Sequence, residues 1–414
     1  MSSGTRLLAL AALTACTGGE GERPVGAVTV SDSAEIRIVQ NRAAPAHPRI
    51  WTVPGPLLEI GVREGEPAYQ LFRVVGVHRF SDGRIVVANS GSHELRFYDS
   101  LGQHQLAVGG EGEGPGEFRT LSFLRRFAGD SLVTLEAGQG RVQVFDDYGT
   151  FVRSFTFEEE FLFPILAGVF TDGSLLAYQQ FDMGPEMEAG ISRPDVELYH
   201  LSSDGSARSS LGSFPGPENY MHVEDGSAMG VGLWFGRSLQ VVVAGDRVVV
   251  APTDRYELRV MERDGELLSL VRMDHEPVPL QPADFDSLRN ERLGWMEHPQ
   301  QRARWARIYE AMPRPRTLPA LRSLMADADR NLWVRDYLPP RDERGLWTVF
   351  DPEGRALGRV ETPEGLWVWE IGSDYVLGTT TDELGVERVQ LWGLEKRGQD
   401  SVPAAAAHPE PESS

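Results

Sequence analysis

A hairpin pattern present in six copies is the feature of this chain that most constrains its fold. In each copy an apolar run ends in a turn that closes on glycine, as in residues 95–102 and 142–149. A second apolar run precedes it, opened by a turn such as Asp82-Gly83. Glycine adopts a positive φ without a Cβ clash, so Asp-Gly between extended runs indicates a β-hairpin. The other copies close at Gly205, Gly265, Gly354 and, in a degraded form without the aspartate, Gly398.

The spacing of these hairpins predicts an all-β chain built as a β-propeller. A repeat of about 45 residues that carries four strands is typical of a propeller blade. The strands are continuous apolar runs, as in residues 247–251, and this suits inner strands that neighbouring blades cover on both faces. A β-sandwich with accidental turn similarity is the alternative, but six matched pairs of turns in order argue against it.

The closure of the ring is also predicted. Residues 58–69 parallel residues 106–118, which read as the outer strand of one blade and its link to the next. The earlier segment is therefore an outer strand with no blade before it. We expect this N-terminal strand to complete the last blade, at about residues 366–394, because closure removes free sheet edges. The predicted propeller spans residues 33–398.

These turns, the run Arg141-Val142-Gln143-Val144-Phe145-Asp146 and the Gly-rich link 110–118 together resemble NHL-type six-bladed β-propellers. The match is best over residues 57–157 and continues to about 398. The resemblance implies a fold more than a function, because the family includes binding modules as well as enzymes. Enzymes of similar fold include lactonases, the amidating lyase and strictosidine-synthase-like proteins.

Three insertions interrupt the repeat, at residues 179–194, 214–236 and 277–319. The last joins blades four and five and is predicted to be helical: Trp305, Ile308, Tyr309 and Met312 share one helix face. Pro282 and Pro299 suit helix starts or breaks. The helices either cap one mouth of the channel or simply pack on the rim. Arg302, Arg304 and Arg307 form either an anion site or a solvated face.

The N-terminus indicates export. A short apolar run after Arg6 ends in Leu13-Thr14-Ala15-Cys16, which resembles the lipobox of bacterial lipoproteins, in which the cysteine is lipidated. The predictions are a signal segment at 1–16 lipidated at Cys16, a tether at 17–32 and a disordered tail at 399–414. The alternative is a stray cysteine in a cytosolic chain. Cys16 is the only cysteine, so no disulfide forms within the chain.

The charge of the chain excludes one class of partner. The formal net charge is −21, and nucleic-acid binding needs clustered Lys and Arg. The same acidity favours cationic partners or metal ions. We therefore expect no nucleic-acid partner, and contact with a membrane through the lipid anchor only.

Catalytic and metal motifs leave little trace in the sequence. His78 is placed on an innermost strand, but the equivalent positions Arg125, Gly168 and Val241 are not metal ligands, which disfavours a zinc ring. The nine histidines show no metal-binding spacing, and there is no Gly-x-Ser-x-Gly motif. Carboxylates of the link, Glu111, Glu113 and Glu117, are weak calcium candidates. The late tryptophans suit either sugar stacking or core filling: Trp333, Trp347, Trp367, Trp369 and Trp392.

The leading functional hypothesis is a monomeric, non-enzymatic binding or scaffold propeller, anchored at the periplasmic side of the outer membrane or at the cell surface. It would recognise a protein or small-molecule ligand at the channel mouth formed by the blade links and the helical insertion. The alternative is a calcium-dependent hydrolase or lyase of the lactonase type, by analogy of fold. The sequence assigns no catalytic, binding or metal-ligating residue besides the lipidation site Cys16.

Overall fold

The computed structural model describes residues 28–44, 50–157, 164–179, 189–224, 226–342 and 344–396. The predicted signal segment 1–16 with Cys16, the first part of the tether and the tail 399–414 lie outside the described residues. Neither described helix is long and apolar enough to cross a membrane.

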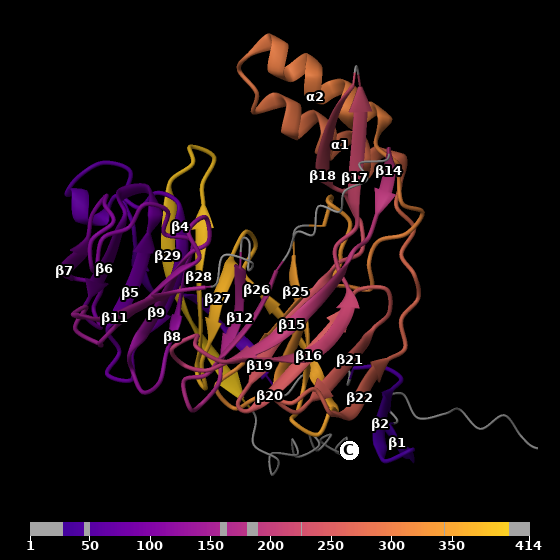
Figure 1. The fold of residues 1–414 in the computed structure, drawn as a ribbon, viewed down its shortest axis with the longest axis horizontal. Coiled ribbons are helices and arrows are strands. Elements are labelled where there is room, and N and C mark those ends of the chain that lie inside the picture. The colour runs from indigo at the N-terminus through magenta and orange to yellow at the C-terminus, as the bar shows by residue number, and fades with distance from the viewer. Residues whose placement is uncertain are drawn as a thin grey trace, which may run out of the picture.

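Most of the described chain forms antiparallel sheets of four strands (Figure 1). The first is β4 (Val74–Arg79), β5 (Ile85–Asn89), β6 (Glu94–Tyr98) and β7 (His104–Gly109). The second is β8 (Phe123–Arg126), β9 (Leu132–Glu136), β10 (Arg141–Phe145) and β11 (Phe151–Thr156). The third is β12 (Pro164–Val169), β13 (Leu175–Gln179), β15 (Asp195–Leu201) and β16 (Arg208–Pro215).

The later sheets follow the same order. The fourth is β19 (Leu239–Ala244), β20 (Arg247–Pro252), β21 (Glu257–Met261) and β22 (Leu267–Met273). The fifth is β23 (Leu321–Ala326), β24 (Leu332–Asp336), β25 (Gly345–Phe350) and β26 (Ala356–Thr362). The last is β27 (Trp367–Ile371), β28 (Tyr375–Thr381), β29 (Glu387–Lys396) and β3 (Ile50–Ile60). Short 3-10 turns lie at Pro67–Tyr69 and Ser90–Ser92.

The first strands of these sheets lie side by side around a common axis. Strand β4 contacts β8 and β27, β8 contacts β12, and β19 contacts both β12 and β23. Buried apolar clusters fill the spaces between neighbouring sheets, including Trp333, Trp347 and Ile371 between the last two. A further cluster joins the last sheet to the first, through Leu391, Ile60 and Val77. This ring of sheets is the architecture of a β-propeller.

An N-terminal strand completes the last sheet, as the sequence predicts. Strand β3 pairs antiparallel with β29, and Ile60 lies opposite Val389. The last sheet therefore combines residues from both ends of the described chain, and its edge is not left free.

The repeated turn glycines have a packing role besides their backbone role. Gly205 has φ 74°, and a Cβ placed on it would lie 2.6 Å from the Phe155 ring of the preceding sheet. Gly149 has φ 80°, and its Cβ would lie 2.9 Å from Phe97. Each turn thus packs directly on the neighbouring sheet, which explains why glycine recurs at this position.

The insertions form a separate lobe, shown at the upper right of Figure 1. It contains β14 (Gly190–Ser192), β17 (Asn219–Glu224), β18 (Ser227–Gly232), α1 (Pro282–Gly294) and α2 (Pro299–Ala311). Because neighbouring strands are antiparallel, the link between the second and third strands of a sheet leaves at the same end as the link to the next sheet. All three insertions therefore emerge at one end of the ring, where β14 pairs with β17.

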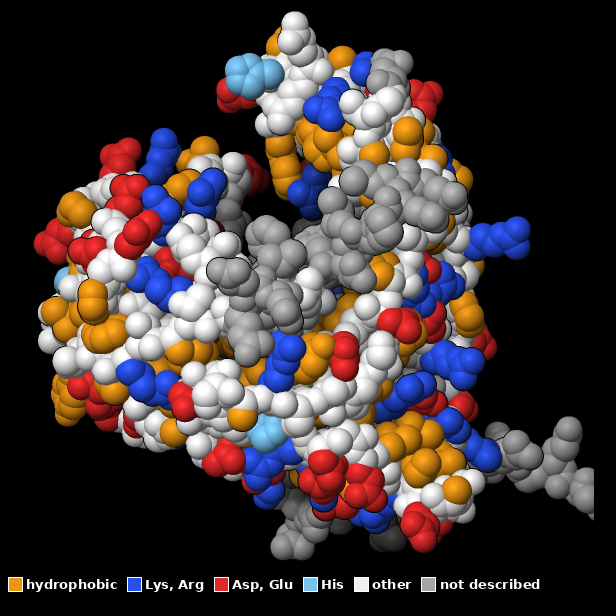
Figure 2. Space-filling view, in the orientation of Figure 1, with side chains coloured by type: hydrophobic (Ala, Val, Ile, Leu, Met, Phe, Trp, Pro, Cys, Tyr) orange, Lys and Arg blue, Asp and Glu red, His pale blue; other side chains and the backbone are white. Residues whose placement is uncertain are grey.

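The helices lie within the predicted insertion 277–319 and pack as their apolar faces predict. Phe285 of α1 and Ile308 and Tyr309 of α2 are buried with Tyr220 of β17. In Figure 2 the lobe projects from the body of the molecule and leaves a recess beside it. The helices therefore cover the β17–β18 hairpin. The sequence did not predict this hairpin.

The predicted tether 17–32 is wrong for its last residues. Val28–Ser33 forms β1, which pairs with β2 (Ile36–Asn41), and β2 adds in parallel to β22. Asn41 is fully buried and bonds the backbone of Gly354 and Ala356 in the next sheet. Backbone pairing, Asn41 and the fully buried Val39 of β2 hold the hairpin, although five of the six β1 residues are exposed.

Candidate functional site

The ring encloses a cavity of about 390 Å³ on its axis. The lining residues come from the second halves of β4, β8, β12, β19, β23 and β27 and from the turn after β23. Arg126 and Ala328 of this lining are exposed, so the cavity opens where the innermost strands end. The insertions join the ring where these strands begin, and no residue of α1 or α2 lines the cavity. The binding site expected at the channel mouth beneath the helical insertion therefore lies at the other end of the ring from the opening of this cavity.

The two sides of the cavity differ in chemistry. The side formed by β27, β4 and β8 carries His78, Arg125, Arg126 and Glu370, which we call the charged wall. On the opposite side, strands β12, β19 and β23 line the cavity with only Gly, Ala, Val, Leu and Met, which we call the apolar wall; the turn after β23 adds Asp327 and Ala328. The members of the apolar wall are Ala167, Gly168, Val169, Val241, Val242, Val243, Leu324, Met325 and Ala326.

Glu370 organises the charged wall. One carboxylate oxygen lies 2.6 Å from His78 Nδ1 and accepts the Arg79 amide at 3.2 Å, while the other accepts the Tyr375 hydroxyl. Burial opposes its charge, but His78 and these hydrogen bonds outweigh burial and lower the pKa of Glu370 below its ordinary value. Burial and the charge of Glu370 together raise the pKa of Tyr375. Glu370 is therefore a carboxylate whose two oxygens are both engaged.

His78 is 4% exposed and has one nitrogen without a partner. Its Nδ1 faces Glu370, and its ring packs edge-on against Phe80 at 5.2 Å. The other nitrogen, Nε2, is buried and makes no hydrogen bond to the described part of the chain. Buried polar atoms are nearly always paired, so this nitrogen is an exception, and it belongs to a side chain that lines the cavity.

Arg125 is the other incompletely paired group of this wall. Its guanidinium donates to the Leu124 carbonyl at 2.9 Å and lies 4.8 Å from the Phe123 ring and 6.0 Å from the Trp369 ring. Among the described residues it forms no salt bridge. Burial lowers the pKa of Arg125, although the charge of Glu370 opposes this effect. Two aromatic rings thus position a cation that lacks a carboxylate partner.

Asp327, in the turn after β23, is fully engaged by its own hairpin. It accepts hydrogen bonds from the Asn331 amide at 2.8 Å and from Trp333 Nε1 at 3.1 Å, and Lys396 Nζ lies 3.6 Å away. Its side chain therefore stabilises the turn and adds no free acceptor to the cavity.

The residues present at the channel do not fit a calcium ion. Calcium takes six to eight oxygen ligands, and the lining carboxylates Glu370 and Asp327 are both occupied by protein donors. Within the described ranges, no three His, Cys, Asp or Glu side chains gather as a metal-binding group. No step of a metal-dependent reaction follows from this geometry.

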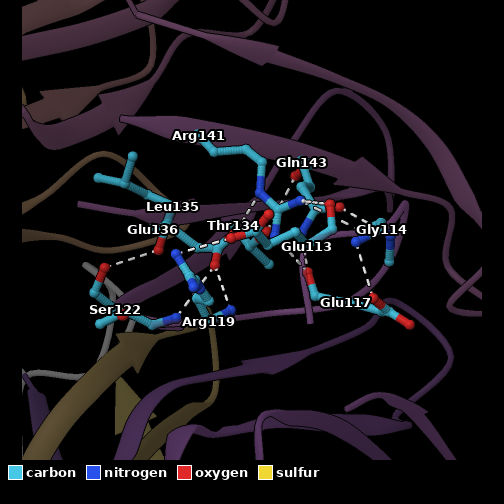
Figure 3. A network of polar contacts seen from close by, with 12 residues as sticks. Glu113, Gly114, Glu117, Arg119, Ser122, Thr134, Leu135, Glu136, Arg141 and Gln143 are labelled. Carbon is cyan, nitrogen blue, oxygen red and sulfur yellow. Dashed lines mark hydrogen bonds and ion pairs between the residues drawn. The ribbon is translucent and has the colours of Figure 1, made fainter. Parts of the chain in front are cut away.

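The link 110–118, considered above for calcium, is held by an arginine instead (Figure 3). Arg141 pairs with buried Glu136 and donates to the carbonyls of Glu113 at 2.6 Å and Glu117 at 2.7 Å. Gln143 binds the Glu117 carbonyl as well, at 2.8 Å. The backbone oxygens that a calcium ion would need are thus used to fix the link between two sheets.

The remaining candidates lie elsewhere. Arg307 pairs with Glu224 of β17 at 2.9 Å, which supports a surface role for that arginine. Trp333 and Trp347 are buried against each other and fill the core, whereas Trp367 is 54% exposed and Trp369 lines the cavity. Cys16 lies outside the described residues, and its lipidation stays a prediction.

Sequence reasoning placed His78 on the channel but missed Glu370, Tyr375 and the role of Arg125. The predicted closure was the available signal, because it makes the last sheet a neighbour of the first and so brings β27 against β4. The sequence aligns Arg125 with His78, but the residue type alone does not show that it lacks a carboxylate partner.

Comparison with known proteins supports the fold and little more. No protein-family model matches the chain, and no curated protein matches it. A solved member of the DUF4221 family from Bacteroides vulgatus is similar over 84% of this chain and 99% of its own, with 10% identity and a TM-score of 0.53. A putative exported protein from Bacteroides fragilis covers 87% and 100%, with 10% identity and a TM-score of 0.48. A gluconolactonase from Xanthomonas campestris covers 86% and 99%, with 14% identity and a TM-score of 0.38. At such identities similarity concerns the fold and not the activity.

Proposed function

We propose that this protein is an exported, lipid-anchored propeller of the NHL type with six blades, which binds a small organic molecule in its central channel. The observation that carries the binding function is the cavity on the axis, where buried His78 is held by Glu370 and keeps one nitrogen unpaired. A cavity of this volume falls in the range of about 300–1,000 Å³ common for small-molecule sites. The blade count is supported by the chain of contacts between the innermost strands and by the β3–β29 closure.

The binding function is tested by plugging the channel. Ala328 is exposed at the mouth, so Ala328→Trp should block entry without disturbing the core. The purified protein is equilibrated with a small-molecule extract of its host, and bound molecules are identified by native mass spectrometry. We expect a bound molecule in the wild type and in the control Leu101→Trp, which alters an exposed turn outside the cavity lining, and its loss in Ala328→Trp. Equal retention by both variants would contradict channel binding.

The anchor is supported by Leu13-Thr14-Ala15-Cys16 at the end of an apolar run. Labelled palmitate should enter the wild-type protein and not Cys16→Ser, which should leave the membrane fraction. Labelling of both would refute lipidation at Cys16.

The proposal also includes a monomer without a nucleic-acid partner, in keeping with the net charge of −21. A protein ligand at the envelope would occupy the outer surfaces and not this cavity.

Catalysis on the bound molecule is the second candidate, favoured by one observation. A histidine with a carboxylate on Nδ1 is oriented to exchange a proton at Nε2. Turnover of lactones or esters that survives a chelator and is lost in His78→Gln would support it. Turnover that depends on added calcium and survives in His78→Gln would instead favour the metal-dependent hydrolase or lyase.

A further inference from the structure

We propose that the molecule bound in the channel is a small carboxylate with an apolar body: Arg125 binds the carboxylate, and the apolar wall covers the body. This inference rests on the proposed channel-binding function and deepens it by assigning the chemical class of the ligand. The supporting observation is that the carboxylates lining the cavity already accept hydrogen bonds from the protein, whereas Arg125 has N–H donors that are not used.

The two carboxylates that line the cavity are largely satisfied by the protein. Glu370 accepts three hydrogen bonds of the roughly four that its oxygens can take, and Asp327 accepts four. A cationic ligand would therefore find little free acceptor capacity on either carboxylate. Desolvating a charge without a free partner is costly, so the geometry disfavours a cation.

The donors of the cavity, by contrast, are incompletely used. The Arg125 guanidinium has five N–H donors, and its hydrogen bond to the Leu124 carbonyl uses one of them. Arg126, at the mouth, lies 3.2 Å from Asp130, so its charge is partly balanced. Arg125 has no such partner in the described part of the chain, and a carboxylate matches its planar fork in charge and shape.

His78 lines the same wall but does not offer this contact. Its Nε2 is buried and unpaired, while Nδ1 faces Glu370. We therefore assign the acid group of the ligand to Arg125 alone.

The apolar wall defines the rest of the ligand. Strands β12, β19 and β23 present only apolar side chains and glycine to the cavity, so they offer no side-chain polar partner. Contact with this surface favours a hydrocarbon body, at about 25 cal/mol per Å² of apolar area removed from water.

The probes are benzoate, its neutral isostere benzamide, and acetate, which lacks the apolar body. Their dissociation constants for the purified full-length protein are measured by isothermal titration calorimetry. We expect benzoate to bind at least about ten-fold more tightly than benzamide, because only benzoate forms a charge-assisted pair with Arg125. Acetate should also bind more weakly than benzoate, because it cannot contact the apolar wall.

The variant Arg125→Gln should remove the preference for benzoate over benzamide, and Arg125→Lys should retain part of it. Arg344→Gln is the matched control, since Arg344 is exposed and pairs with Asp342 outside the cavity lining. This control should leave all three dissociation constants unchanged. Circular dichroism and thermal unfolding show whether each variant is folded.

The outcomes separate this inference from the proposed function. Equal binding of benzoate and benzamide, or an unchanged preference in Arg125→Gln, overturns the assignment of a carboxylate. If benzamide or a neutral extract molecule binds the wild type, and Ala328→Trp abolishes this binding, channel binding stands and only the ligand class is wrong. If Ala328→Trp changes the binding of none of the probes and of no extract molecule relative to the wild type, both proposals fail.

Discussion

On one side of the channel, Glu370 joins His78, Tyr375 and the Arg79 backbone into a bonded group beside Arg125. On the other side, the equivalent strands β12, β19 and β23 present only glycine and apolar residues to the cavity. The backbone repeat is the same on both sides, so the difference lies in the side chains. The ring acts as a scaffold whose innermost strands can be varied one at a time, and here the polar lining residues of these strands come from three neighbouring sheets.

The largest expected effect comes from removing the organiser of the charged wall. Glu370→Ala leaves the Tyr375 hydroxyl, His78 Nδ1 and the Arg79 amide without their acceptor. We expect a loss of about 3 kcal/mol in the free energy of unfolding, measured in urea. Val241→Ala on the apolar wall, a half-buried site, should cost only about 1 kcal/mol. Equal losses would show that the two walls do not differ in this way.

A smaller effect should appear as a dependence on pH. The pKa of Glu370 is lower in the folded protein, despite burial, because of His78 and the hydrogen bonds from His78, Tyr375 and Arg79. The unfolded chain therefore binds more protons in acid, and this stabilisation is present above the ordinary glutamate pKa and lost as pH falls through the folded value. Urea titrations of the wild type and Glu370→Gln should show a shallower acid decline for the variant. Parallel declines would contradict the assignment.

Arg125 should behave differently from Glu370 although it lies on the same wall. Its side chain is partly buried and its charge has no carboxylate partner in the described residues, so the folded state gains little from it. We expect Arg125→Met to change the free energy of unfolding by less than about 1 kcal/mol in either direction, because lost packing and relieved burial of charge offset each other. A loss as large as that of Glu370→Ala would make Arg125 a structural residue and not a ligand-binding one.

The smallest effect concerns the apolar wall alone. Val241→Thr keeps the shape of the side chain and adds a hydroxyl that has no side-chain partner on that wall. Benzoate should bind about three-fold more weakly, while acetate should be unaffected. Calorimetry with both probes checks this; equal weakening of both would point to a general disturbance of the cavity.

Much of the ring could be predicted from the sequence, because its hairpins are local. Turns such as Asp172-Gly173 and the parallel between residues 58–69 and 106–118 predict the sheets and the β3–β29 closure. The apolar faces of α1 and α2 are likewise local, and the structure confirms them. The end of the predicted tether failed because β2 adds to β22 in parallel, a pairing between distant segments that no local pattern signals.

The candidate site depends on contacts between distant residues more than the sheets of the ring do. His78 and Glu370 are 292 positions apart in the chain, and they meet only because the ring closes. The sequence places His78 on an innermost strand, but it does not show which of 61 acidic residues would face it. The unpaired state of Arg125 depends on what surrounds it, so it could not be read from the residue type.

A crystal structure of the protein soaked with 4-bromobenzoate tests carboxylate binding in the channel, because the anomalous signal of bromine locates the ligand. We expect one bromine site against the apolar wall near Val241 and Met325, with the carboxylate on Arg125. Bromine found only outside the channel, such as in the surface pocket lined by Phe72 and Arg96, would contradict it.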